Sequence, residues 1–592
     1  MLKRVPGAEE ILNTNNNQRQ GGPERGFGSG GDQILINGKR LSGKSNNIND
    51  ALARIVAKNV SKIELIRGAA TGLDVQSQGL VINVLLIGGV STSSTSWKST
   101  NKYTIGNAIA PEFLLSHSGS KNGIDYMFSF ERTKELGGFS NEEIYYDPQD
   151  LRTGEEDIDG NFKFSDYKIN SNISYDFEDG SELRLNGLFK PGTFKVHEVQ
   201  IQTGDNPDYL TWNRLNNFKE WEVGGDYNHD FGKFGKLKSL FVINRKDADG
   251  GVNRYSGEGE ARYEYATEKF KEKQGEDIIR SSLTKSINAK QSIEVGGEAA
   301  FNSFDRQFMN FERSAINQPS IIETSDDVKI KENRFEIFAN QSYNISPKIV
   351  LQSSLTAEFS KITADSIFIN GDSNHRDTSF KYLKPRLNLR YDYTKQDQLR
   401  LTAEKKVSQL GFYNFVAYFD QSTEEIKLGN TNLRPEQIWE FSLTYEHRFK
   451  NDGGSIETEI FYKHYKDYIG RVDFTDYVDY GGNSVSDVAF FALNPNSALR
   501  DSIDFNSKPG NTDGANVRGI KIKSNFRLGF IGVPQAVLTL GYIYEKRRSI
   551  DQFTKLKRNF PWAPDHTVNL SLRHDITKWQ LSYGFEGKYE SA

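Results

Sequence analysis

The sequence contains no cysteine, and this absence excludes disulfide bonds, thiolate metal sites and cysteine nucleophiles. Its eight histidines are scattered without an H-E-x-x-H pattern or a similar cluster, so we expect neither a zinc enzyme nor any other metal site. Long apolar runs are also lacking. The longest, Leu80 to Ile87, carries Asn83 and falls far short of the roughly 18 residues of a membrane-spanning helix. A transmembrane β-barrel remains possible.

A large excess of either charge is absent as well. The chain has 75 Lys and Arg against 79 Asp and Glu, a net charge of -4, so we predict no nucleic-acid partner. No apolar segment of a secretory signal follows Met1. We therefore expect the sequence to be a fragment whose natural start is missing.

Abundant residues point to β-structure. Phe (39), Tyr (27) and Gly (52) are frequent and Pro (15) is scarce, which is typical of many strands joined by turns. From about residue 93 onward, apolar and polar residues alternate with a period of two, as in Leu387–Tyr393, Phe441–Glu446 and Val568–Arg573. This alternation predicts about nineteen strands, each with one apolar and one polar face.

The connections between these strands fall into two classes. Short polar turns are predicted at 178–181, 288–291, 346–348, 395–398, 451–454 and 576–578, and long connections at roughly 133–165, 247–277, 305–328, 411–434, 469–514 and 547–562. Short turns on one side and long loops on the other are typical of an outer-membrane barrel. A lysine or arginine that faces lipid at mid-membrane costs about 2–4 kcal/mol, so the charged 26% of the chain must face a polar lumen or lie in loops.

Residues 1 to about 92 differ in character and predict a small α/β unit. Apolar residues spaced i, i+4 and i+7 predict a short helix between Asn47 and Lys58. Strands are expected at Val60–Ile66 and Leu80–Ile87. The N-terminal unit is therefore a separate domain from the β-rich remainder.

One segment of this unit also spells a nucleotide-binding motif. Gly38–Ser45 fits the phosphate-binding pattern G-x-x-x-x-G-K-[ST]. A P-loop NTPase needs a helix that begins at Lys44 and Ser45, together with further parallel strands and a metal-binding Asp. The helical register instead begins near Ile48, and the α/β pattern ends by residue 92. We predict that the chain is not an enzyme and uses no cofactor, with the NTPase as the less favoured alternative.

Four segments carry motifs of a known family. They are Arg25–Phe27 with Ile34–Gly38, Val60–Gly68 with Gly79–Val84, Gly429–Glu436, and Glu459–Ile469. The first pair is similar to R-G-F and to a strand followed by D/N-G, and the second pair to the motifs I-E-V-x-R-G and G-V-I-N of a plug. Gly429–Glu436 is similar to the barrel motif G-N-x-x-L-x-P-E, and Glu459–Ile469 to the strand that usually follows this motif. The chain thus resembles the TonB-dependent receptors, outer-membrane transporters with a plug inside a 22-stranded barrel.

The resemblance implies a mostly β fold. It consists of an antiparallel transmembrane β-barrel of the 22-stranded type with about 19 strands present, and an N-terminal α/β plug domain inside the lumen. We expect the plug at residues 1–92 and the barrel at 93–592. The chain stops at Ala592 without the family's terminal aromatic residue, so the last strands are expected to be missing.

Site residues are implied only in the plug. In the family a plug Glu and Arg pair with charges of the barrel wall, which implies a plug–barrel lock at Glu64 and Arg67. Ligand contacts are expected at the plug apices: Arg25, Phe27, Asp74 and Gln76. The family's L-Y-G step reads Leu73-Asp74-Val75 here, so an expected ligand-facing aromatic residue is absent.

The function implied is energised import across the bacterial outer membrane. A scarce extracellular ligand, a ferric siderophore by default, would enter the periplasm with energy from the TonB-ExbB-ExbD complex. Oligosaccharide, haem and cobalamin are alternative ligands, and a passive porin or adhesin is an alternative from another class. Aromatic residues of one predicted loop would suit a sugar or a siderophore catechol equally: Phe412, Tyr413, Phe415, Tyr418 and Phe419.

Overall fold

The computed structural model of the chain describes residues 33–36, 52, 55, 60–67, 80–86, 93–104, 108–147, 151–204, 207–369, 371, 373–416, 418–420, 425–427, 429–451, 453–475, 477, 484–486, 490, 507–552, 555–560 and 563–591. Two compact units are present. The first contains Gly31–Gln341 and Thr356–Tyr382, and the second contains Ser342–Leu355 and Leu383–Ala592.

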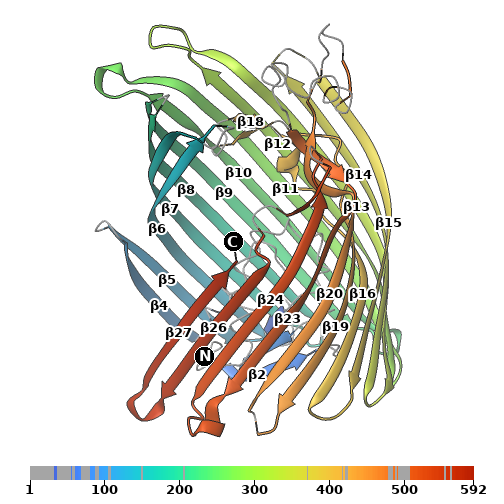
Figure 1. Cartoon of the computed structure of the whole chain (residues 1–592). Coiled ribbons are helices and arrows are strands. Elements are labelled where there is room, and N and C mark those ends of the chain that lie inside the picture. Colours follow the sequence, from blue (N-terminus) through green and yellow to red (C-terminus); the bar gives the residue numbers. More distant parts are fainter. Residues whose placement is uncertain are drawn as a thin grey trace. The chain divides into compact units, whose positions relative to one another are not determined.

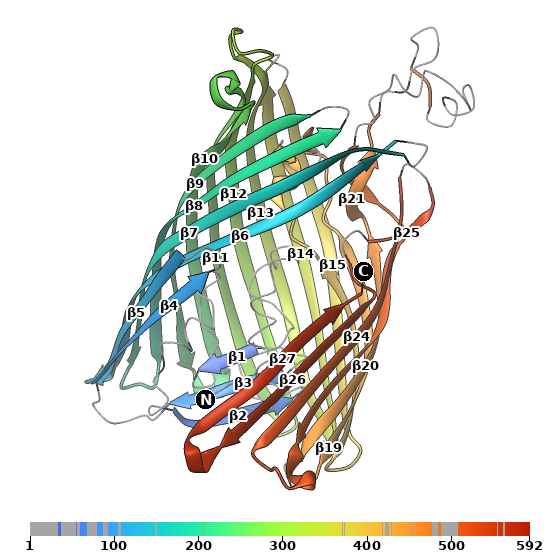
Figure 2. The same cartoon turned by 60° about the vertical axis from the view of Figure 1, so that its left-hand side comes forward.

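A three-stranded sheet forms the described part of the N-terminal region, drawn in blue in Figure 2. Its strands β1 (Gln33–Ile36), β3 (Leu80–Leu86) and β2 (Val60–Arg67) lie in that order, with β3 parallel to β1 and antiparallel to β2. Val81 and Ile82 point to opposite faces of the central strand, yet both are buried. The sheet is therefore covered on both faces, which explains the apolar run that the sequence shows here.

The helix expected between Asn47 and Lys58 falls mostly outside the described residues. Leu52 is helical, and the amide of Ile55 donates to the Leu52 carbonyl at 3.1 Å. The segment Gly38–Ser45, with its nucleotide-binding pattern, also lies outside the described residues.

Twenty of the described strands form one antiparallel sheet whose pairing order closes as a barrel (Figure 1). Strands that follow one another in the chain are neighbours in the sheet. Their bounds are β4 (Ser93–Thr104), β5 (Ala108–Lys121), β6 (Ile124–Tyr146), β7 (Arg152–Asp176), β8 (Glu182–Gly204), β9 (Asp208–Asp230), β10 (Lys236–Ser256), β11 (Tyr263–Asn288), β12 (Gln291–Glu312), β13 (Ile321–Ser346), β14 (Ile349–Phe368), β15 (Ser373–Asp392), β16 (Asp397–Val407), β19 (Gln437–Phe449), β20 (Gly454–Lys466), β23 (Ala515–Arg527), β24 (Ala536–Ile550), β25 (Lys557–Asn559), β26 (His566–Ile576) and β27 (Leu581–Glu590).

Two small hairpins and several 3-10 turns lie between strands of the large sheet in the chain. The hairpins pair β17 (Tyr418–Asp420) with β18 (Glu425–Lys427) and β21 (Tyr468–Asp473) with β22 (Ser507–Thr512). The 3-10 turns are η4 (Gly232–Phe234), η5 (Gly259–Ala261), η6 (Phe412–Phe415), η7 (Leu528–Ile531) and η8 (Thr577–Trp579). Among the described residues, no helix combines the length and apolar character that crossing a membrane would require.

The short turns are confirmed, but several predicted long connections are wrong. The segments 133–165 and 247–277 consist mostly of the paired ends of β6 with β7 and of β10 with β11. The segment 305–328 likewise contains the ends of the neighbouring strands β12 and β13. β7 alone has 25 residues, whereas a tilted strand needs about 9–11 to cross a bilayer. These hairpins therefore extend the sheet well beyond one bilayer thickness at the end opposite the short turns.

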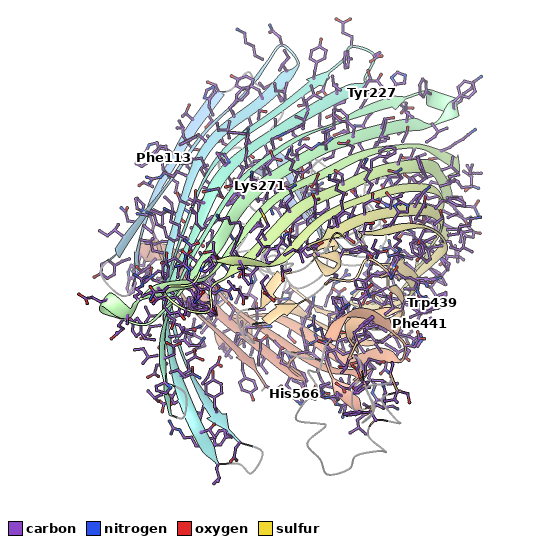
Figure 3. All side chains as sticks on the ribbon, turned by 90° about the horizontal axis from the view of Figure 1, so that it is seen from above. Phe113, Tyr227, Lys271, Trp439, Phe441 and His566 are labelled. Atoms are coloured by element: carbon purple, nitrogen blue, oxygen red, sulfur yellow. The ribbon has the colours of Figure 1, made fainter. Side chains whose placement is uncertain are left out.

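The two faces of the sheet reverse the usual arrangement of a soluble protein. Across β6 to β9, the paired residues Phe130, Ile169, Phe189 and Trp221 are all exposed. One residue along the same strands, on the other face, Ser129, Asn170, Leu188 and Glu222 are all buried. We call these the apolar face and the polar face; Figure 3 shows the exposed Phe113, Trp439 and Phe441 among the projecting side chains. An extended exposed apolar surface marks a contact with lipid or another apolar partner.

Candidate functional site

The plug sheet places one predicted site residue in a defined contact. Glu64 lies opposite Asn83 in the β2–β3 pairing, and the Asn83 amide donates to the Glu64 carboxylate at 3.0 Å. The Lys62 ammonium donates to its other oxygen at 2.9 Å. These two contacts, that of Lys62 first, lower the pKa of Glu64. The carboxylate is therefore ionised at neutral pH and, at 31% side-chain exposure, can accept a further partner.

The other predicted plug residues give no further contact. Arg67 pairs with Leu80 through the backbone, and its side chain lies outside the described part of the structure. The predicted apex residues Arg25, Phe27, Asp74 and Gln76 also lie outside the described residues. The two described partners of Glu64 belong to the plug sheet itself, so its pairing with the barrel wall stays a prediction.

The motif Gly429–Glu436 forms the best-defined cluster of the second unit. The motif precedes β19 at the end of the sheet opposite the short turns. It contacts Asp467, between β20 and β21, and Asn511, in β22. We call the motif together with Asp467 and Asn511 the loop clamp. Arg434 donates to Asp467 from Nε at 3.0 Å, and Gln437 donates to the same carboxylate at 3.1 Å. Asn511 donates to the carbonyls of Arg434 and Asp467, each at 2.8 Å.

Glu436 closes the other side of the loop clamp. Its carboxylate accepts a hydrogen bond from the Ile469 amide at 2.7 Å, and its carbonyl accepts one from the Ser408 amide at 2.9 Å. Burial raises the pKa of the Glu436 carboxyl group, although hydrogen bonds to this group from the Ile469 amide and the Ser408 side chain oppose the shift. The clamp thus holds a buried carboxyl group at the point where three segments of the chain meet.

Close backbone contact explains the glycine that opens the motif. A Cβ on Gly429 would lie 2.2 Å from the carbonyl carbon of Phe415, so only glycine fits here. The amide of Asn430 donates to the Asn414 carbonyl at 2.8 Å, and Leu433 is fully buried. The motif is therefore an anchor for the loop that follows β16. Hydrogen bonds from Asn430 to the Pro509 carbonyl and from Arg434 to Asp467 fix the position of that loop relative to β22 and the end of β20.

The predicted aromatic contacts divide into two groups. Phe415 is 2% exposed and packs edge-on against Phe412 with ring centres 6.0 Å apart, so it supports the loop instead of offering a surface to a ligand. Tyr413 is 50% exposed and offers part of its ring to solvent. Sequence reasoning missed another aromatic cluster, in which Tyr468 stacks on Phe560 at 4.8 Å and meets Tyr465 edge-on at 5.8 Å. Phe560 lies 92 positions after Tyr468, so no local motif could have placed it against the two tyrosines.

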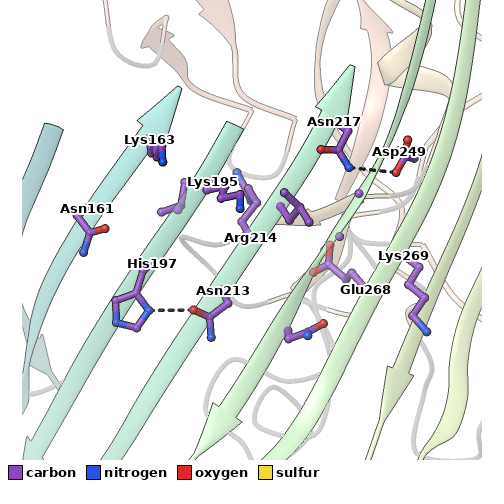
Figure 4. A pocket seen from close by; sticks show the side chains of 15 residues that line it. Asn161, Lys163, Lys195, His197, Asn213, Arg214, Asn217, Asp249, Glu268 and Lys269 are labelled. Atoms are coloured by element: carbon purple, nitrogen blue, oxygen red, sulfur yellow. Dashed lines mark hydrogen bonds between the residues drawn. The ribbon is translucent and has the colours of Figure 1, made fainter. Parts of the chain in front are cut away.

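The first unit contains a polar recess of about 560 Å³ where β7 to β11 extend beyond the row of Ile169 and Phe189 (Figure 4). His197 and Asn213 share a hydrogen bond of 2.9 Å at its rim, and Asn217 donates to Asp249 at 3.4 Å. The remaining lining residues include three lysines: Lys163, Lys195 and Lys269. The recess was not predicted, because strand register alone brings these residues together.

Three solved structures share the fold at low sequence identity. The siderophore receptor PiuA from Acinetobacter baumannii has a TM-score of 0.56 at 12% identity, covering 99% of this chain and 84% of that one. The hemophore receptor HasR of Serratia marcescens gives 0.54 at 10%, covering 95% and 84%. The ferric yersiniabactin uptake receptor FyuA from Yersinia pestis gives 0.52 at 11%, covering 94% and 80%. A comparison with curated proteins found no match.

Two family models match the sequence itself. The TonB-dependent receptor plug domain matches residues 1–78, and the TonB-dependent receptor-like β-barrel matches residues 145–592. The plug match contains β1 and β2 and ends before β3, and the barrel match begins at the end of β6 and contains every later strand of the large antiparallel sheet. Because the barrel match alone covers most of the sequence, this chain belongs to the TonB-dependent receptor family.

Proposed function

We propose that this chain is a plugged outer-membrane importer that binds a scarce extracellular ligand and passes it to the periplasm with energy from the TonB-ExbB-ExbD complex. Its family consists of outer-membrane receptors and transporters, not of enzymes. The observation that carries the proposal is the reversed sheet, with Ile169 and Phe189 exposed and Asn170 and Glu222 buried. Such a wall suits lipid on one face and a polar passage on the other.

A ferric siderophore is the ligand that we propose. Two of the structurally similar proteins, PiuA and FyuA, are siderophore or ferric-chelate receptors by their names, and this is the support for an iron chelate. The exposed Tyr413 in the loop held by the clamp offers an aromatic surface that would suit a catechol. Oligosaccharide, haem and cobalamin stay as alternative ligands for the same site.

Energy coupling gives the direct test of this function. A strain without the gene, complemented by the full-length protein, should accumulate radiolabelled ferric siderophore under iron limitation. This uptake should stop when a proton uncoupler is added. Energised uptake of a labelled oligosaccharide in the same strain, without siderophore uptake, would show that the ligand is a sugar and would still support an importer. Uptake that continues at the same rate in the presence of the uncoupler would contradict energised import and favour a passive porin.

The domain division and the lock belong to the same proposal. We assign residues 1–92 to the plug and 93–592 to the barrel, with Arg25, Phe27, Asp74 and Gln76 as ligand contacts at the plug apices. Glu64 and Arg67 form the proposed plug–barrel lock, supported by the ionised, part-exposed Glu64 carboxylate.

A matched pair of variants tests the lock in the complemented strain. Glu64→Gln should increase entry of a large antibiotic, because a neutral amide binds a barrel cation less tightly than a carboxylate does. Glu178→Gln makes the same chemical change at an exposed position in a short turn and should leave entry unchanged. Equal antibiotic entry in both variants would contradict the lock without affecting the importer itself.

A further inference from the structure

Three lysines of the first unit lie in one row across the extended part of the sheet. From β7 to β11, the residues paired in this row are, in order, Lys163, Lys195, Leu215, Gly251 and Lys269. Like charges placed directly opposite each other on neighbouring strands destabilise a sheet. Within the described residues, neither Lys163 nor Lys195 forms a salt bridge or hydrogen bond, and Lys269 only lies over the Phe311 ring at 5.3 Å.

The row shares the apolar face with the exposed residues nearer the short turns. Lys195 follows Phe189 by six residues on β8, an even spacing that places both side chains on the same face. The distance along the strand is about 20 Å, and a tilt of about 45° reduces the height to about 15 Å. A group bound at Lys195 would therefore lie just beyond the hydrocarbon that Phe189 contacts.

The recess between these lysines is shaped for a compact polar group. Gly251 occupies the row position between Leu215 and Lys269, and a Cβ there would lie 2.0 Å from the Glu268 carbonyl oxygen, so no side chain can fill the space. Amides and an imidazole line the next row: Asn161, His197, Asn213 and Asn253. Asp249 is the carboxylate on this face of the recess, and the ion pair of Glu268 with Arg254 at 3.5 Å lies on the polar face.

We propose that this recess binds the phosphorylated sugar headgroup of a lipid in the outer leaflet around the barrel. Lys163 and Lys195 would neutralise one phosphate, and Lys269, three strands from Lys195, would neutralise a second. The asparagines and His197 would exchange hydrogen bonds with sugar hydroxyl groups. Lipid is the occupant because the recess continues the face that contacts hydrocarbon. The site rests on the outer-membrane placement of the chain and is independent of the imported ligand.

Lipid binding to the purified, full-length protein tests the proposal. The protein in neutral detergent is titrated with diphosphorylated lipid A and with the same glycolipid after phosphatase treatment, and bound lipid is counted by native mass spectrometry. The wild type should retain the phosphorylated form preferentially. The variant Lys163→Gln, Lys195→Gln, Lys269→Gln should bind it roughly tenfold or more weakly, because each lysine near an anionic headgroup strengthens binding.

A second triple variant keeps the test independent of net charge. Lys121→Gln, Lys233→Gln, Lys290→Gln removes the same charge at the short-turn end of the first unit and should bind lipid like the wild type. Equal lipid binding by both triple variants would overturn the proposal, as would equal retention of the dephosphorylated glycolipid. Binding of poly-glutamate, but not of lipid, that depends on the three recess lysines would show that an acidic protein is the partner and would also overturn it.

Discussion

Asp467 holds two side chains, one in the loop clamp and one at the start of β19. Its carboxylate accepts hydrogen bonds from Arg434 and Gln437 at 3.0 and 3.1 Å. We predict that Asp467→Asn lowers the free energy of unfolding by about 1 kcal/mol, a small value because water replaces much of the lost contact at Arg434, which is 58% exposed. Thermal unfolding of the protein in detergent measures this loss.

An exposed aspartate provides the matched control for that change. Asp157 lies on β7 with an exposed side chain, so Asp157→Asn should leave the unfolding temperature unchanged. If both variants lose the same stability, the effect comes from net charge, and the structural role of Asp467 is wrong.

Glu436 gives the loop clamp a pH dependence of known sign. Burial raises the pKa of its carboxyl group above the unfolded value near 4.3, so the folded clamp binds the proton more tightly than the unfolded chain does. This contribution to stability is complete below the unfolded pKa and is lost as pH rises through the folded pKa. Glu436→Gln should therefore reduce the pH dependence of the unfolding temperature above pH 4 and leave the hydrogen bond from Ile469 possible.

Parallel unfolding temperatures of the two proteins would contradict a shifted pKa for Glu436. If wild type and Glu436→Gln show parallel unfolding temperatures across that pH range, Glu436 titrates normally, and another group causes any pH dependence that both share.

Single residues were predictable only where a local motif names them. Gly429 and Glu436 stand in a recognisable motif, and their contacts give that motif a physical reason. Glu64 was named in the same way; Lys62 and Asn83 lower the pKa of its carboxyl group, and its role in a lock stays a prediction. Lys163 and Lys195 are 32 positions apart, and only the register of β7 and β8 makes them partners. No pattern in a single sequence specifies such a register across long strands.

The strands of the large sheet behave as two-faced elements, and β7 allows a direct test. Ile169 is 52% exposed in the middle of the apolar row formed with Phe130 and Phe189. Ile169→Lys should lower the free energy of unfolding in lipid vesicles by about 2–4 kcal/mol, because a cation at mid-membrane loses its hydration. Asp157→Lys, on the same face of the same strand but in its extended part, should change it by less than about 0.5 kcal/mol.

Reversible urea unfolding in phospholipid vesicles compares these two variants with the wild type. An equal cost at both positions, or no cost at Ile169, would mean that lipid does not cover the apolar face around Ile169.

At the level of elements, period-two alternation correctly predicted the strands near the short turns. One face contacts an apolar medium there, so the alternation is strong. The extended halves of β6 and β7 carry polar residues on both faces and looked like loops for that reason. β3 was predicted from its continuous apolar run, and its burial on both faces explains that run. The helix predicted near Leu52 is described at too few residues to be compared.

For the whole molecule, composition and motif together predicted the family and the fold class, but not the ligand. The absence of cysteine and of long apolar runs left a β-barrel as a possible membrane protein, and Gly429–Glu436 and Val60–Gly68 then resembled one family. Ligand choice depends on side chains gathered from several loops. Phe560 illustrates such long-range assembly, because it packs against Tyr465 and Tyr468 from a segment more than 90 positions away.

The central claim is that the N-terminal domain closes a wide polar passage. A barrel of about 20 strands leaves an aqueous channel unless something fills it, and we propose that residues 1–92 fill it as the gate. The measurement is the single-channel conductance in planar lipid bilayers of the full-length protein and of a variant without residues 1–92. Circular dichroism first establishes that both proteins have the same strand content. The account predicts a closed full-length protein and a large, steady conductance after the deletion. Free conduction by the intact protein, or a closed barrel without residues 1–92, would contradict it.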